Sequence, residues 1–147
     1  MTVNEASVNL SAAGGADHIR GQLEIIRKAL EPAFGPDTAI PGTVMTTPSA
    51  GHCAAVATIV NAMLGGRLVS TSVNGISHWF NRLSVGNDEI DIDITGDQFG
   101  YAAIRIAPAD ALFPGSRLRA FQDVNAETRE RAARLAVRAG LTRPDFR

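Results

Sequence analysis

The stretch GHCAAVATIVNAMLGG, residues 51–66, decides how the rest of the chain is interpreted. Its apolar residues recur at helical spacing, which predicts a helix over residues 51–64 with Ser49 as its cap. The glycine pair at 65–66 ends that helix. Cys53, the single cysteine of the chain, therefore falls in the first turn.

Working outward from this helix, the sequence predicts further elements on both sides. Three strand-like runs follow it, with hairpin signals at residues 74–75 and 86–88 between them. Asp17 caps an earlier amphipathic helix, and Asn125 caps a final helix. The predicted ranges are helices 18–34 and 126–139, strands 67–73, 77–85 and 89–95, a fourth strand 101–106, and loops 35–48 and 107–116. The order helix, helix, antiparallel strands, helix predicts an α+β fold with helices against one face of a sheet.

Length and composition are those of one globular domain. We expect residues 1–15 to form a disordered N-terminal tail and residues 16–147 to form a single domain. The net charge of −1 and the lack of a basic, aromatic-rich stretch argue against nucleic acid as a partner. No apolar run approaches the about 20 residues that span a bilayer, and no secretory signal is visible, so we expect no membrane partner and a cytoplasmic protein. No motif calls for a cofactor.

Cys53 is the first candidate for chemistry. The N-terminus of a helix carries partial positive charge, which stabilises a thiolate, and the thiolate is the nucleophilic form. The backbone N–H of Cys53 also points to where an oxyanion would form. However, Cys53 shares its helical stripe with Val56 and Val60. On the helix alone, an inert buried cysteine is the better interpretation.

The strands supply a partner for the cysteine. Alternation places His78 and Arg82 on one face of their strand, and Asp91 and Asp93 on the face opposite three isoleucines. A turn at residues 86–87 sets Arg82 against Asp91 and puts Asp93 diagonal to His78. A carboxylate beside a histidine fixes its tautomer and raises its basicity. Taken singly, each residue is better read as structural: a satisfied histidine, and aspartates on a solvated face paired with Arg82.

The segments GHCAAVATIVNAMLGG, SHWFNRL and DIDITGDQF, with the tail SRLRAFQDVNAETRERAARL, resemble the YunG-like family of small bacterial proteins over roughly residues 48–140. That family has Gly-Gln-Cys at a helix start, then a glycine pair, a His-aromatic-aromatic-Asn-Arg strand and an Asp-Leu-Thr-x-x-Gln-Phe strand end. The matching residues here are Gly51, Cys53, Gly65, Gly66, His78, Trp79, Phe80, Asn81, Arg82, Asp93, Thr95, Gln98 and Phe99.

The resemblance implies a papain-like, NlpC-like fold with Cys53 as nucleophile, His78 as base and Asp93 as the group that orients His78. One departure stands out, because His52 replaces the family glutamine. If that glutamine donates to the oxyanion, the ring N–H of His52 can substitute; alternatively the ring points to solvent.

Neighbouring residues receive structural or auxiliary roles. Asn81 lies on the face opposite His78, where a structural hydrogen bond is expected. Arg82 is expected to pair with Asp91, with an acidic group of a substrate as the other possible partner. Trp79 is expected to lie in the core rather than to form a substrate platform.

Two functions compete. The first is a cysteine-nucleophile hydrolase or acyl transferase of the peptidase or amidase type, acting on a small-molecule or peptide or protein substrate that the sequence does not specify. The second is a catalytically inactive binding module on the same fold. Metal binding by Cys53, His52 and His78 is the weakest reading, because two of the three are adjacent and no zinc-ligand spacing is present. The sequence carries no indication of oligomeric state.

Overall fold

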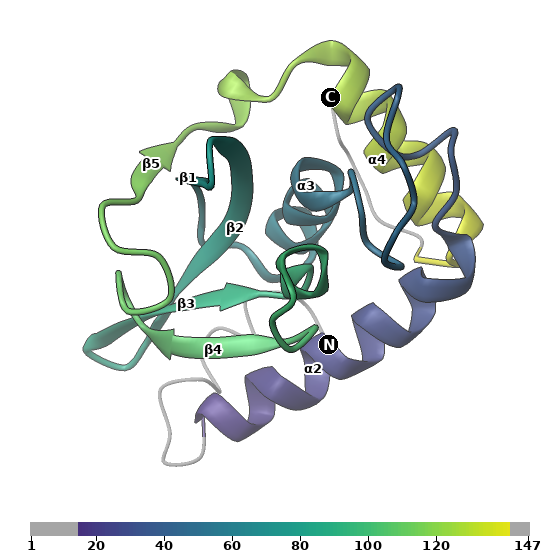
Figure 1. Cartoon of the computed structure of the whole chain (residues 1–147). Coiled ribbons are helices and arrows are strands. Elements are labelled where there is room, and N and C mark those ends of the chain that lie inside the picture. The colour runs from purple at the N-terminus through teal and green to yellow at the C-terminus, as the bar shows by residue number, and fades with distance from the viewer. Residues whose placement is uncertain (1–14, 142–147) are drawn as a thin grey trace.

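The computed structural model describes residues 15–141 and has an α+β architecture (Figure 1). The helices are α2 (Gly15–Leu30), α3 (Cys53–Leu64) and α4 (Ala126–Arg138), with short 3-10 helices η1 (Glu31–Ala33), η2 (Gly96–Phe99) and η3 (Phe121–Asp123). The strands are β1 (Arg67–Val73), β2 (Ile76–Val85), β3 (Asp88–Asp93), β4 (Arg105–Pro108) and β5 (Arg117–Arg119). No helix in this part of the chain is both long and apolar enough to cross a membrane.

The five strands form one antiparallel sheet in the order β4-β3-β2-β1-β5. Asn74 and Gly75 both have positive φ, as the tight β1–β2 turn requires. At the β2–β3 turn, Ser84 pairs with Glu89 and Arg82 pairs with Asp91. The predicted register of this hairpin is confirmed.

The main core lies between the sheet and the helices, which gather on one side of it (Figure 1). Helix α3 contacts both β2 and α4. Apolar residues of all three helices meet the isoleucine face of β3, as their helical and alternating spacings predicted. The buried members include Ile19, Leu23, Leu30, Val56, Ile59, Val60, Leu83, Ile92, Ile94, Ala132 and Leu135.

Several predicted boundaries are corrected. Helix α2 begins at Gly15, so Asp17 lies in its first turn and does not cap it. Helix α3 begins at Cys53, and the Ser49 hydroxyl donates to Asp97 Oδ1 (2.6 Å) rather than capping the helix. The fourth strand lies at 105–108 instead of 101–106.

Strand β5 was not predicted, because the three residues Arg-Leu-Arg are too short to show an alternating pattern. It pairs with β1 and extends the sheet beyond the predicted strands. Most of the predicted tail, residues 1–14, lies outside the described residues, as do residues 142–147.

The second face of the sheet is also buried, contrary to the prediction of a solvated aspartate face. Asp91 is fully buried and Asp93 is 2% exposed. The segment 109–116 folds back over them: the backbone N–H of Asp110 donates to Asp91 Oδ2 (2.9 Å), and Phe113 packs against Phe80. The aspartates and His78 therefore lie in a second, partly aromatic core.

Candidate active site

Cys53 is the first residue of α3, and the loop before it is shaped by Gly51. Gly51 has φ of +74°, a conformation that suits glycine, and a Cβ there would collide with Thr43. Cys53 is only 4% exposed. Its Sγ lies 3.9 Å from the carbonyl oxygen of Ser77 on β2. The start of α3 is thus held against the strand that carries His78.

His78 is fully buried and is held from one side by Asp93. The His78 Nε2 to Asp93 Oδ2 distance is 2.9 Å. The other ring nitrogen, Nδ1, is buried and has no hydrogen-bond partner among the described residues. Cys53 lies beside the imidazole ring and raises the pKa of His78, but its Sγ makes no hydrogen bond to Nδ1. The imidazole therefore has one satisfied nitrogen and one available nitrogen.

The surroundings of His78 favour its charged form. Burial lowers the pKa of the imidazole, but the hydrogen bond and charge of Asp93, together with the neighbouring Cys53, raise it more. The net effect raises the pKa of His78 from 6.5 to about 9. At neutral pH the structure thus favours an imidazolium beside the sulfur atom.

Asp93 is itself fixed by further hydrogen bonds. Its Oδ1 accepts from the backbone N–H of Thr95 (3.0 Å) and from the Thr95 hydroxyl (3.2 Å), which leaves Oδ2 for His78. Each carboxylate oxygen is therefore occupied. This arrangement holds the orientation of the histidine ring.

Aromatic side chains enclose the histidine. The ring of Phe99 meets the imidazole edge-on at 4.9 Å between centroids, and the ring of Phe113 does so at 5.1 Å. Together with Phe80 they exclude water from the His78–Asp93 pair. The role of Phe113 was missed, because it lies in a loop without any periodic pattern.

His52 has neither of the orientations considered from the sequence. Its ring is fully buried, with Nε2 2.7 Å from the Thr38 hydroxyl and Nδ1 2.8 Å from the carbonyl oxygen of Ala50. It also packs against Phe34. Burial lowers the pKa of His52. Both ring nitrogens are thus engaged in the core, and this geometry does not favour the expected oxyanion or auxiliary role of His52, which stays a prediction.

Arg82, Asp91 and Asn81 make structural contacts. Arg82 donates to both oxygens of Asp91, at 2.6 and 3.1 Å, and also to Asp110. Asn81 donates to the carbonyl oxygen of Ala57 in α3 (2.9 Å). The expected Arg82–Asp91 pair and the expected structural bond of Asn81 are confirmed. Arg82 is thereby directed to its own carboxylate partners.

A cleft of about 240 Å³ opens beside the cysteine. We call it the Cys53 cleft, and its lining includes Cys53, Ser77, Trp79, Val124, Asn125 and Thr128. Trp79 is half-buried and packs with Val124. Trp79 therefore packs against the core, as predicted, and also lines the Cys53 cleft.

The positions of the side chains do not favour metal binding by Cys53, His52 and His78, since the ring nitrogens of His52 contact Thr38 and the carbonyl oxygen of Ala50. Within residues 15–141, no three His, Cys, Asp or Glu side chains are grouped as metal ligands.

Comparison with curated proteins and with solved structures finds no match. A family model described as "YunG protein" matches residues 22–137, which is most of the chain. The segments that carried the resemblance, including those of Cys53, His78 and Asp93, fall inside this range. The chain therefore belongs to the YunG protein family.

Proposed function

We propose that this protein is a cysteine-nucleophile hydrolase or acyl transferase on a papain-like fold, with Cys53, His78 and Asp93 as its triad. One observation carries the proposal. Buried His78 is oriented by Asp93 through Nε2, its Nδ1 is left without a partner, and Cys53 lies beside the His78 side chain. An unsatisfied buried nitrogen is costly, and its retention beside a thiol is typical of a functional site.

The proposed reaction proceeds in two steps. The thiolate of Cys53 attacks a carbonyl carbon of the substrate, and the C–S bond forms as the carbonyl electrons move to oxygen. His78 gives its proton to the leaving amine or alcohol as the tetrahedral intermediate collapses to a thioester. Neutral His78 then takes a proton from water or an acceptor, which attacks the thioester and releases the thiolate.

The start of α3 supports stabilisation of the charge that develops on the carbonyl oxygen. The first backbone N–H groups of a helix lack intrahelical partners and carry partial positive charge. Cys53 is at this position in α3. Asp93 does not accept the proton in this scheme; it holds the ring and stabilises the imidazolium.

A binding module without turnover is the second candidate. It is favoured by the low exposure of Cys53 and by the contact of its thiol with the Ser77 carbonyl rather than with His78 Nδ1. In that reading the Cys53 cleft holds a ligand and the thiol takes no part in chemistry.

Acylation by p-nitrophenyl acetate separates the two. For the full-length protein we expect a burst of p-nitrophenolate, one acetyl group on Cys53 by intact mass, and slower thioester hydrolysis. Both steps should be strongly slowed in His78→Ala and unchanged in His18→Ala, which alters an exposed histidine of α2. Acetylation at the same rate in wild type and His78→Ala would overturn the enzymatic proposal and favour the binding module.

A further inference from the structure

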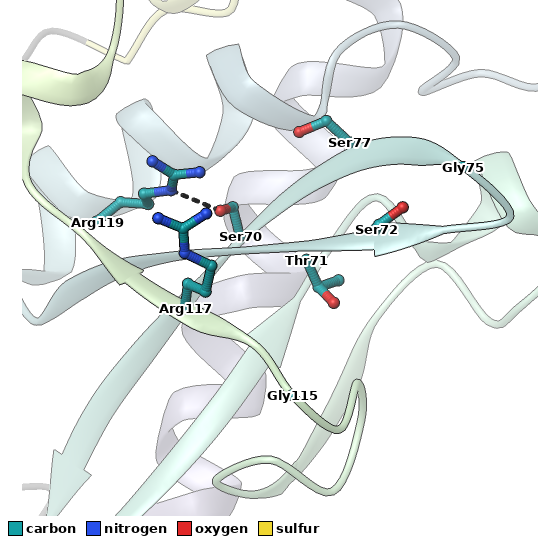
Figure 2. Close-up of a pocket in the computed structure, with 8 residues that line it drawn as sticks. All are labelled: Ser70, Thr71, Ser72, Gly75, Ser77, Gly115, Arg117 and Arg119. Carbon is teal, nitrogen blue, oxygen red and sulfur yellow. Dashed lines mark hydrogen bonds between the residues drawn. The ribbon is translucent and has the colours of Figure 1, made fainter.

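A second hollow lies on the sheet next to the Cys53 cleft. It measures about 450 Å³ and is bordered by β1, the β1–β2 turn, the first part of β2 and β5. We call it the arginine pocket, and Figure 2 shows its lining: Ser70, Thr71, Ser72, Gly75, Ser77, Gly115, Arg117 and Arg119. None of its lining residues belongs to the proposed triad.

Two arginines bring uncompensated positive charge to this pocket. Arg117 and Arg119 alternate on β5 and so face the same side of the sheet, and Arg117 pairs directly with Ser70. No carboxylate lines the pocket, and no described carboxylate forms an ion pair with either arginine. Other arginines of the fold do have such partners, namely Arg27 with Asp97, Arg82 with Asp91 and Arg138 with Asp37.

The pocket also contains hydroxyl groups and one guanidinium that is held in place by a hydrogen bond. Arg119 Nε donates to the buried Ser70 hydroxyl (2.8 Å), which holds that guanidinium next to that of Arg117 (Figure 2). The Ser77 hydroxyl points toward the same side, whereas Thr71 points away (Figure 2). A guanidinium fork and hydroxyl donors are the groups that recognise carboxylate and phosphate oxygens.

The pocket is continuous with the proposed site of chemistry. Ser77 lines both hollows, and its carbonyl oxygen is the atom that contacts Cys53 Sγ. Trp79 lines the Cys53 cleft, and the guanidinium of Arg119 lies over its ring at 5.7 Å. An extended molecule lying across Ser77 and Trp79 would thus reach the sulfur at one end and the arginines at the other.

We infer that Arg117 and Arg119 form an anion-binding subsite that takes the carboxylate or phosphate group of the ligand whose carbonyl reaches Cys53. The last part rests on the proposed function; the anion site itself does not. The substrate class that follows is an amide or ester bearing a second, negatively charged group, such as an acyl derivative of an acidic amino acid or of a phosphorylated compound.

Binding of simple anions tests the subsite without any cysteine chemistry. Full-length protein is titrated with inorganic phosphate and, separately, with glutarate, while the arginine Nε–H NMR signals are followed. We expect saturable binding of at least one of them, weakened about tenfold or more in Arg117→Gln and in Arg119→Gln. Arg119→Lys should retain part of the affinity. The control Arg67→Gln removes an exposed arginine on the opposite face of β1 and should leave binding unchanged.

The two arms also identify the ligand chemistry, since the tighter anion indicates whether the substrate group is a phosphate or a carboxylate. No saturable binding of either anion to wild type overturns the inference. Equal loss in Arg67→Gln and Arg117→Gln overturns it as well, because the effect would then be one of net charge.

The link to Cys53 is tested by comparing alkylation with iodoacetate and with neutral iodoacetamide. The iodoacetate rate divided by the iodoacetamide rate should be high in wild type. This ratio should fall about threefold to tenfold in Arg117→Gln, because steering of a charged reagent depends on nearby fixed charge. Anion binding together with slow alkylation by both reagents would refute the proposed function and leave the anion site standing. Fast iodoacetamide alkylation without anion binding would support the proposed function and overturn the anion site.

Discussion

Replacement of Asp93 by asparagine should lower the pKa of His78, because it removes the charge and the hydrogen-bond acceptor that favour the imidazolium. In the wild type, the pKa of His78 is raised from 6.5 to about 9. This difference corresponds to about 3 kcal/mol in favour of the imidazolium, since one pKa unit is worth about 1.4 kcal/mol. Burial lowers this pKa, whereas Asp93 and Cys53 both raise it, Asp93 by more than Cys53. In Asp93→Asn we therefore expect the pKa of His78 to fall to 6.5 or below.

The assay is an NMR titration of the imidazole Cε1–H signals in protein labelled at histidine, from about pH 5 to about pH 10.5, a range that brackets both values. The chain has three histidines, so His18 on the surface of α2 and His52 in the core serve as internal references. Because Cys53 also raises the pKa of His78, the variant Cys53→Ser separates its contribution from that of Asp93. It should lower the pKa of His78 by less than Asp93→Asn does.

Asp91→Asn is the matched control for this titration. Asp91 lies on the same strand and face as Asp93 and is equally buried, but its partner is Arg82. The same isosteric change should leave the pKa of His78 near its wild-type value. A wild-type His78 that titrates at or below 6.5, or that responds equally to the two variants, would refute the assignment of Asp93 as its charge partner.

Three further outcomes follow from the geometry. Asp91→Asn should lower the free energy of unfolding in urea by about 3 kcal/mol, because breaking the buried pair leaves Arg82 with only the exposed Asp110 as a charge partner. Gly51→Ala should lower the thermal midpoint more than Gly42→Ala, since both have positive φ but only the first would place a Cβ against a neighbouring side chain. His52→Gln should change the rate of Cys53 alkylation by less than about threefold, because His52 is engaged in the core. A loss of rate comparable to that of a triad variant would instead support the oxyanion role of His52.

The hairpin that carries His78 could be predicted from local signals. The turn at residues 86–87 and the alternation of isoleucine with aspartate determine which residues face each other. Once Arg82 opposes Asp91, the contact between His78 and Asp93 follows from strand geometry. The sequence also placed Cys53 in the first turn of its helix, although the helix begins at Cys53 itself and Ser49 does not cap it.

The surroundings of these residues could not be predicted, because they depend on contacts between distant segments. The fold-back of residues 109–116, which buries Asp91 and places Phe113 on His78, has no signature in a loop sequence. The orientation of His52 is decided by Thr38, which lies in a loop 14 residues away along the chain. Strand β5 forms only by pairing with its neighbour β1, and the arginine pocket exists only where these two strands lie side by side.

Alkylation of Cys53 by iodoacetamide as a function of pH tests the central claim most directly. Native wild type is compared with His78→Ala and with His18→Ala, and circular dichroism verifies that each protein stays folded. At pH 6 an ordinary thiol is only about 0.3% thiolate, so a thiolate held by imidazolium should react about tenfold to a hundredfold faster, after allowance for its lower nucleophilicity. The account predicts that wild type and His18→Ala keep this fast reaction between about pH 6 and pH 8, and that His78→Ala loses it. Slow alkylation in all three native proteins, or equal rates in wild type and His78→Ala, would contradict the claim that His78 activates Cys53.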